Sequence, residues 1–205
     1  MTAIRRVTSS APAIGEAALA GLVAGAFTAH LQGVLPTDWN TVANSGAVWT
    51  LVAFTVTAGV ARSMAAAAGV GLLVLVGEVA GYYIDTAGLR HIPVLRSEEV
   101  LWTAAALWIG PLTGWAAFFT RWGTPAQRAI SVAAICGVVA GEGAYLIRIA
   151  GLPRSGWVEV TVGALAAAGA LVVVPASIRL RLLSAAGGVV VAVAVYGAYS
   201  QSVLR

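Results

Sequence analysis

The stretch from Met64 to Ile84, MAAAAGVGLLVLVGEVAGYYI, decides the fold class. It is 21 residues long and carries a single charged side chain, that of Glu78. An α-helix that crosses the hydrocarbon core of a bilayer needs about 20 consecutive apolar residues, so this stretch predicts a transmembrane helix. A carboxyl group inside such a helix is a candidate functional group, because ionisable side chains are costly there.

The composition of the whole chain agrees with this interpretation. Of its 205 residues 60% are hydrophobic and 10% are charged, whereas charged residues make up about 25% of a typical soluble domain. We therefore exclude a soluble enzyme. The net charge is +4, but all basic residues are arginines that stand singly or in close pairs, which excludes a nucleic-acid-binding protein. The single cysteine, Cys136, excludes an internal disulfide.

Further apolar stretches of similar length predict an all-α fold, a polytopic transmembrane helical bundle. We expect one integral membrane domain, 1–205, with seven spans, or six because the second stretch is short. The spans are expected near 14–35, 45–61, 64–84, 100–120, 129–150, 158–178 and 182–204. Abundant glycine and alanine favour close contact between these helices in lipid.

The distribution of charge along the chain predicts an orientation. Seven crossings place the two ends of the chain on opposite sides, with seven arginines on the N-terminal side and five on the other. This bias favours a cytoplasmic N-terminus in the plasma membrane. The acidic residues are distributed more unevenly between the two sides of the membrane than the arginines are. Glu16 alone falls on the N-terminal side, and the outer half or outer loops hold the other acids: Asp38, Glu78, Asp85, Glu98, Glu99, Glu142 and Glu159.

Two of these acids, Glu78 and Glu142, lie inside expected spans and are the candidate catalytic residues. Each follows a glycine and lies about 21 Å along its helix, in the outer half of the bilayer. An ionisable group there costs at least about 2.5 kcal/mol and usually faces a partner or a water-filled cavity. Burial favours the neutral carboxyl, which is a potential proton donor. The alternative is a structural glutamate that bonds to a neighbouring helix.

Aromatic side chains in the same half of the membrane are candidates for a binding pocket. Trp49, Trp108 and Tyr145 lie deeper than an interfacial aromatic belt, and Tyr82 follows Glu78 by one turn. An aromatic wall beside protonatable carboxyls suits an apolar substrate that becomes cationic, because ring faces stabilise cations.

Polar residues at the outer ends of the helices complete the expected substrate site. They are Asn44, Asp38 and Arg148, although capping of the second helix is an equally good role for Asn44 or Ser45. The two histidines and scattered acids form no recognisable metal-binding set, and phosphate-binding and hydrolase motifs are absent from the sequence. We expect no metal and no cofactor.

The segment LPTDWNTVANSGAVWTLVAF resembles the signature of an uncharacterised actinobacterial family of small integral membrane proteins. Its W-x4-N-S-x3-W-x3-A-F pattern matches at Trp39, Asn44, Ser45, Trp49, Ala53 and Phe54. The resemblance implies topology alone. An arginine-only, Ala/Gly/Val-rich composition fits an actinobacterial gene of high GC content. The architecture also resembles membrane-embedded cyclases of prenylated natural products, which implies a metal-free cyclisation that an intramembrane carboxylic acid starts by protonation.

Three functions follow as hypotheses. The first is a membrane terpene or meroterpenoid cyclase, an enzyme of isomerase or lyase type, in which an intramembrane Glu protonates an isoprenoid substrate and aromatic rings shield the carbocation. The second is a small-solute or proton-coupled transporter, or a substrate-capture subunit, that uses the same pocket. The third is a non-catalytic assembly partner whose intramembrane acids contact another membrane protein.

Overall fold

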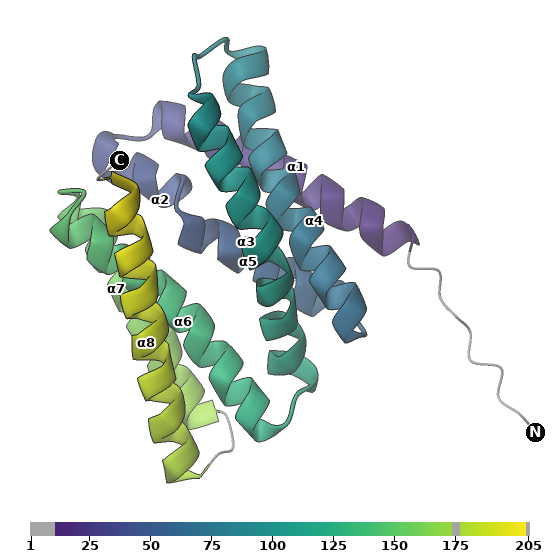
Figure 1. Ribbon diagram of the computed structural model, residues 1–205, viewed down its shortest axis with the longest axis vertical. Helices are drawn as coiled ribbons and strands as arrows, with labels where there is room; N and C mark the ends of the chain where they lie inside the picture. Colours follow the sequence, from purple (N-terminus) through teal and green to yellow (C-terminus); the bar gives the residue numbers. More distant parts are fainter. Residues whose placement is uncertain (1–10, 174–176, 204–205) are drawn as a thin grey trace, which may run out of the picture.

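The computed structural model describes residues 11–173 and 177–203, without the side chains of residues 11–13, 38, 171–173 and 202–203. Within these ranges the chain is a bundle of helices with no strand (Figure 1). The elements in chain order are α1 (Ala11–Val34), α2 (Thr37–Ala43), α3 (Gly46–Val60), α4 (Met64–Tyr83), the π-helix η1 (Ile84–Leu89), α5 (Arg96–Trp122), α6 (Pro125–Arg148), α7 (Pro153–Val173) and α8 (Ile178–Val203).

The predicted all-α membrane bundle is confirmed. Six helices of the described part are long and apolar enough to cross a membrane, which is the lower of the two numbers that the sequence allowed. The expected span at 158–178 falls on α7, which is not among these six, and its residues 174–176 lie outside the described ranges. The other expected spans overlap α1, α3, α4, α5, α6 and α8 closely.

Three local features differ from the prediction. The chain between the first two expected spans contains the short helix α2, and α5 extends beyond the expected span 100–120 at both ends. The helix that contains Glu78 does not end at residue 84 but continues as η1. Its hydrogen bonds widen there, since the backbone N–H of Arg90 donates to the carbonyl oxygen of Asp85 at 2.9 Å. An i→i+5 bond of this kind is typical of a π-helix, which is often found at functional sites.

Side-chain caps fix where three of the helices begin. The Ser45 hydroxyl accepts a hydrogen bond from the backbone N–H of Val48, and Ser63 caps α4 in the same way. Thr124 and Gln127 form a reciprocal capping box at the start of α6. These bonds satisfy backbone donors that no residue of the helix itself can pair with.

Glycines on two faces of α4 let it pack closely between α1 and α5. A Cβ atom at Gly71 would collide with the carbonyl oxygen of Gly110 and come within 2.8 Å of the backbone nitrogen of Gly114, on α5. On the other face, a Cβ atom at Gly77 would lie 3.1 Å from the Cα atom of Gly21, on α1. Small residues at such crossings allow helix backbones to approach in lipid.

The helix α6 has the equivalent position in a second group of three helices. A Cβ atom at Gly141 would collide with Ala192 of α8, and one at Gly143 would meet the backbone of Gly156 on α7. In Figure 1, α6, α7 and α8 lie together on the left, whereas α1 and α4 lie on the right. Each glutamate that the sequence singled out therefore lies on the central helix of a group of three.

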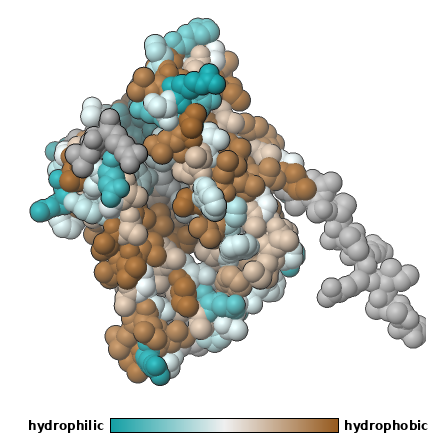
Figure 2. Space-filling view, in the orientation of Figure 1, coloured by the Kyte–Doolittle hydropathy of each residue, from teal (hydrophilic) through white to brown (hydrophobic). Residues whose placement is uncertain are grey.

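The surface agrees with a membrane environment. Many large apolar side chains are exposed, for example Phe27 at 60%, Leu165 at 67% and Val190 at 67%. Figure 2 shows apolar side chains over the sides of the bundle and hydrophilic ones chiefly near its ends. Apolar surface of this extent is unfavourable in water and favourable in lipid.

Candidate functional site

A cavity of about 300 Å³ lies between α3, α4, α5, α6 and α8. This volume is at the lower end of the range for small-molecule sites. Most of the lining side chains are aliphatic or aromatic, and only Thr50 and Tyr199 contribute hydroxyl groups. The lining residues are Gly46, Trp49, Thr50, Leu75, Val79, Leu101, Trp102, Ala105, Ala106, Ile109, Val138, Val195, Ala198 and Tyr199.

Five aromatic rings from five different helices form a continuous series along this cavity. Trp49 lies 5.8 Å from Tyr82 and 6.4 Å from Trp102, measured between ring centroids. Trp102 lies 6.3 Å from Tyr199, which in turn lies 5.2 Å from Tyr145. These separations fall within the range of favourable aromatic pairs. Of these rings, Trp49, Trp102 and Tyr199 line the cavity itself.

The carboxyl group of Glu142 is fixed at the N-terminus of α3. One of its oxygens accepts a hydrogen bond from the backbone N–H of Gly46 at 3.1 Å, and the other accepts one from Ala47 at 2.6 Å. Two backbone donors at the positive end of a helix dipole favour the negatively charged carboxylate. Both donors are supplied by α3, so this helix offsets part of the cost of burying the Glu142 carboxyl group.

Tyr199 connects this carboxyl group to the cavity. Its hydroxyl interacts with Glu142 by a hydrogen bond and lies against Gly46, where a Cβ atom would collide with the hydroxyl oxygen. Gly46 and Tyr199 both line the cavity. A tyrosine hydroxyl can both donate and accept a hydrogen bond, so it can relay a proton between a carboxyl group and a bound molecule.

A second acid, Glu159, belongs to the same cluster. It is only 4% exposed, and its carboxyl group lies beside the Ser45 side chain, which caps α3. Glu159 interacts electrostatically with both Glu142 and Tyr199. Its Cβ atom lies at the crossing of α6 and α7, 2.9 Å from where Gly143 would carry one. Two buried carboxyl groups that interact electrostatically do not both ionise readily, so the pair favours holding one proton.

Sequence reasoning missed Glu159 as a site residue, although it counted this acid on the outer side. The available signal was a lone acid within the apolar sequence of α7, two turns after Pro153. Gly143 and Gly156, which bring α7 against α6, lie on consecutive helices. The sequence alone does not show which face of α7 turns toward α6, so the burial of Glu159 became visible only in the fold.

Glu78 is the largest of the fully buried side chains in the described part of the chain, at 1% exposure. Neither carboxyl oxygen has a hydrogen-bond partner among the residues that the structure describes. The backbone of Glu78 packs against Gly25 of α1, and its neighbours Leu75 and Val79 line the cavity, but Glu78 does not. The structure therefore separates the two acids that the sequence grouped together, because only Glu142 adjoins Tyr199 and Gly46.

Of the other residues that the sequence predicted for the site, some lie at the site and others lie at the surface. Tyr82 and Tyr145 belong to the series of rings, and Asn44 is the half-buried residue that ends α2. Trp108, expected in a pocket wall, is instead 77% exposed and faces outward from α5, because its neighbour Ala106 is on the buried face. Arg148 is exposed in the last turn of α6, and the side chain of Asp38 lies outside the described residues.

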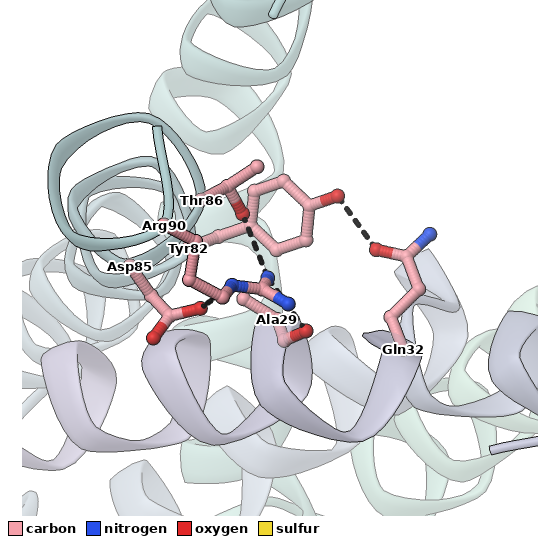
Figure 3. A network of polar contacts seen from close by, with 6 residues as sticks. All are labelled: Ala29, Gln32, Tyr82, Asp85, Thr86 and Arg90. Carbon is pink, nitrogen blue, oxygen red and sulfur yellow. Dashed lines mark hydrogen bonds and ion pairs between the residues drawn. The ribbon is translucent and has the colours of Figure 1, made fainter. Parts of the chain in front are cut away.

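A polar network ties the end of α4 to α1 beside the site (Figure 3). Arg90 forms an ion pair with Asp85 at 2.7 Å, and its guanidinium group also donates to the carbonyl oxygen of Ala29 at 2.9 Å. The Tyr82 hydroxyl donates to Gln32 at 2.6 Å. The π-helix brings the i and i+5 residues Asp85 and Arg90 to one face, so η1 makes this ion pair possible. The network holds the Tyr82 end of the ring series in place.

Comparison with known proteins shows the family. A model described as a family of unknown function, DUF6518, matches residues 4–204. Because the match covers nearly the entire chain, the protein belongs to this family. No curated protein and no solved structure matches the chain.

Proposed function

We propose that this member of the DUF6518 family is a membrane-embedded cyclase that protonates an isoprenoid-type substrate in the cavity between α5 and α8. One observation carries the proposal. Tyr199 lines an apolar cavity with aromatic walls, and it also interacts with a buried pair of carboxyl groups. A cavity with this lining favours an apolar molecule over a polar solute. The resemblance to membrane cyclases of prenylated natural products points in the same direction.

The proton source in this proposal is the pair Glu142 and Glu159. In this proposal the two backbone N–H groups at the N-terminus of α3 stabilise Glu142 as the carboxylate. Glu159, which accepts no backbone N–H bond within the described residues, holds the proton that the pair shares. Tyr199 lies between this pair and the cavity and passes the proton on. Glu159 thus takes the role of general acid, and Glu142 the role of the fixed countercharge.

The chemistry needs no co-reactant. The π electrons of a terminal C=C bond form a C–H bond with the incoming proton and leave a carbocation on the neighbouring carbon. The π electrons of a second double bond then close the ring by forming a C–C bond. Loss of a proton from the final cation restores a double bond and returns the proton to the carboxyl pair. The cations are stabilised by the ring faces of the aromatic residues that line the cavity, Trp49, Trp102 and Tyr199.

The substrate enters from the lipid in this account. Leu101 and Ile109 line the cavity and are also 52% and 42% exposed on the outside of α5. The helix α5 packs chiefly on α4, and α8 chiefly on α6, so neither closes the space between them. A long isoprenoid is therefore proposed to place its reactive end in the cavity and leave the rest of its chain in the bilayer.

The same proposal includes the membrane in which the protein lies and its orientation in that membrane. We place the protein in the plasma membrane of an actinobacterium with a cytoplasmic N-terminus. This placement is based on composition and on the arginine distribution that results when α7 crosses the bilayer as a seventh span. The carboxyl pair then lies in the outer half of the bilayer.

The test is turnover by the purified protein in lipid, with farnesylated aromatic acceptors as substrates. We expect the wild type and Glu99→Gln, an exposed acid at the start of α5, to cyclise the substrate equally. Glu159→Gln, Glu142→Gln and Tyr199→Phe should each lower the rate by at least about 100-fold, the usual contribution of general acid catalysis.

Two results would overturn the proposal. If Glu159→Gln and Glu142→Gln keep full turnover while Glu78→Gln abolishes it, the proton comes from the other buried acid. If no prenylated substrate is converted and proteoliposomes instead accumulate a small solute, the protein is a transporter.

A further inference from the structure

Three arginines gather at the end of the bundle opposite η1, and two of them lie near the ring of one tryptophan. Arg62 lies in the connection between α3 and α4, and Arg121 lies in the last turn of α5 beside Trp122. Arg128 lies in the first turn of α6. Two separate helix connections thus bring their basic residues to one place where four apolar helices end.

The geometry around Trp122 holds two guanidinium groups near a single ring. The Cζ atom of Arg121 lies 5.1 Å from the ring centroid, and that of Arg62 lies 5.9 Å from it. Both distances are within the range of cation–π contacts. Trp122 is 51% exposed, so the ring and the guanidinium groups face the surroundings of the protein.

Hydrogen bonds to backbone carbonyl oxygens hold these arginine side chains in place but do not neutralise their positive charge. Arg121 donates from Nη1 to the carbonyl oxygen of Ala58 at 2.6 Å. Arg128 donates to the carbonyl oxygens of Gly123 at 2.9 Å and Arg121 at 3.2 Å. Arg62 makes no hydrogen bond within the described residues, which leaves its planar set of N–H donors available.

No carboxylate compensates this positive charge in the described part of the chain. The ion pair that the structure contains, between Arg90 and Asp85, lies at the opposite end of the bundle. Guanidinium groups bind phosphate oxygens through paired, charge-assisted hydrogen bonds. The helix ends place this charge at the surface of the bilayer, where an exposed indole is also favoured.

We propose that Arg62 and Arg121, held around Trp122, bind the headgroup phosphate of an anionic phospholipid. The lipid is favoured over a free phosphate ion because apolar helix surfaces adjoin the site and can contact its acyl chains. Basic groups of this kind at helix ends recognise anionic lipids. The inference is independent of the cavity and of the proposed reaction.

The experiment measures phosphatidylglycerol binding to the purified full-length protein by native mass spectrometry in detergent. The test variant is Arg62→Gln/Arg121→Gln, and the matched control is Arg96→Gln. Arg96 is an exposed arginine at the other end of α5, about 40 Å away along the helix. Phosphatidylcholine, whose headgroup has no net charge, is titrated in parallel.

The double variant should bind phosphatidylglycerol about tenfold or more weakly, while Arg96→Gln binds it like the wild type. Phosphatidylcholine binding should be the same for all three proteins. Equal phosphatidylglycerol binding by the double variant and the wild type would refute the site. Displacement of phosphatidylglycerol by millimolar inorganic phosphate would show a site for a free anion and would also overturn the proposal. Arg62→Lys/Arg121→Lys, which keeps the charge but loses the planar donors, should bind with intermediate strength.

Discussion

The carboxyl group of Glu142 on α6 lies 2.6 Å from the backbone nitrogen of Ala47 on α3, although 95 residues separate them in sequence. An intramembrane acid thus caps a helix that belongs to the other part of the bundle. This contact explains how a charged group is accommodated in an apolar interior. It also brings the N-terminus of α3, Tyr199 and the cavity together.

The first prediction concerns the charge of Glu142. Glu142→Gln should lower the free energy of unfolding by about 1–3 kcal/mol, because an amide replaces the charged acceptor of two backbone N–H groups. Denaturation with dodecyl sulfate in mixed micelles, followed by circular dichroism, measures this change. Glu99→Gln should alter stability by less than about 0.5 kcal/mol. Unchanged stability of Glu142→Gln would mean that Glu142 is neutral in the protein.

The second prediction concerns the space at the start of α3. Gly46→Ala should displace the Tyr199 hydroxyl and weaken both ligand binding and turnover, because the new methyl group would occupy the place of that hydroxyl. Gly59→Ala lies on the same helix with open space around it and should be neutral or slightly stabilising, by up to about 1 kcal/mol. Binding of a fluorescent prenyl analogue measures the difference. Equal binding by both variants would argue against the role of Tyr199.

The third prediction concerns the crossing of α4 and α5. Gly71→Ala should destabilise the fold by about 1–3 kcal/mol, since its Cβ atom would meet the backbone of Gly110 and Gly114. Gly69→Ala, on the same helix but with nothing within 4 Å, should cost nothing. The same denaturation assay compares the two. If Gly69→Ala were the more destabilising substitution, the assignment of the α4 face that packs against α5 would be wrong.

The fourth prediction concerns the ion pair in η1. A double-mutant cycle with Asp85→Asn and Arg90→Gln should give a coupling free energy of about 0.5–1 kcal/mol, because both side chains are partly exposed, at 16% and 30%. The coupling should decrease at high salt. A coupling of zero at low salt would show that this ion pair does not contribute to the stability of the fold.

The fold was largely predictable because its main determinant is local in sequence. Apolar stretches of about 20 residues define membrane helices by themselves, and the expected 64–84 agrees with α4 at Met64–Tyr83. The π-helix was not predictable, since its i→i+5 hydrogen bonds depend on Arg90 reaching both Asp85 and the end of α1.

The site was predictable only in part, because its residues meet through contacts that are distant in sequence. Glu142, Trp49 and Tyr145 were recognised from their depth in the predicted spans, and they do gather near one cavity or its ring series. The depth of a residue in the membrane does not show in which direction its side chain points around the helix axis. For that reason Trp108 was expected inside but lies outside, and Glu159 was overlooked.

The most direct test of the central claim is to carry out the reaction in D2O and determine the isotopic composition of the product. The account predicts a cyclised isomer of the substrate that carries one deuterium on the carbon that receives the proton. Glu159→Gln and Tyr199→Phe should form this deuterated product at least about 100-fold more slowly, whereas Glu99→Gln should form it at the wild-type rate. A cyclised product without deuterium, or formation of the deuterated product by Glu159→Gln at the wild-type rate, would contradict proton transfer from the Glu142–Glu159 pair.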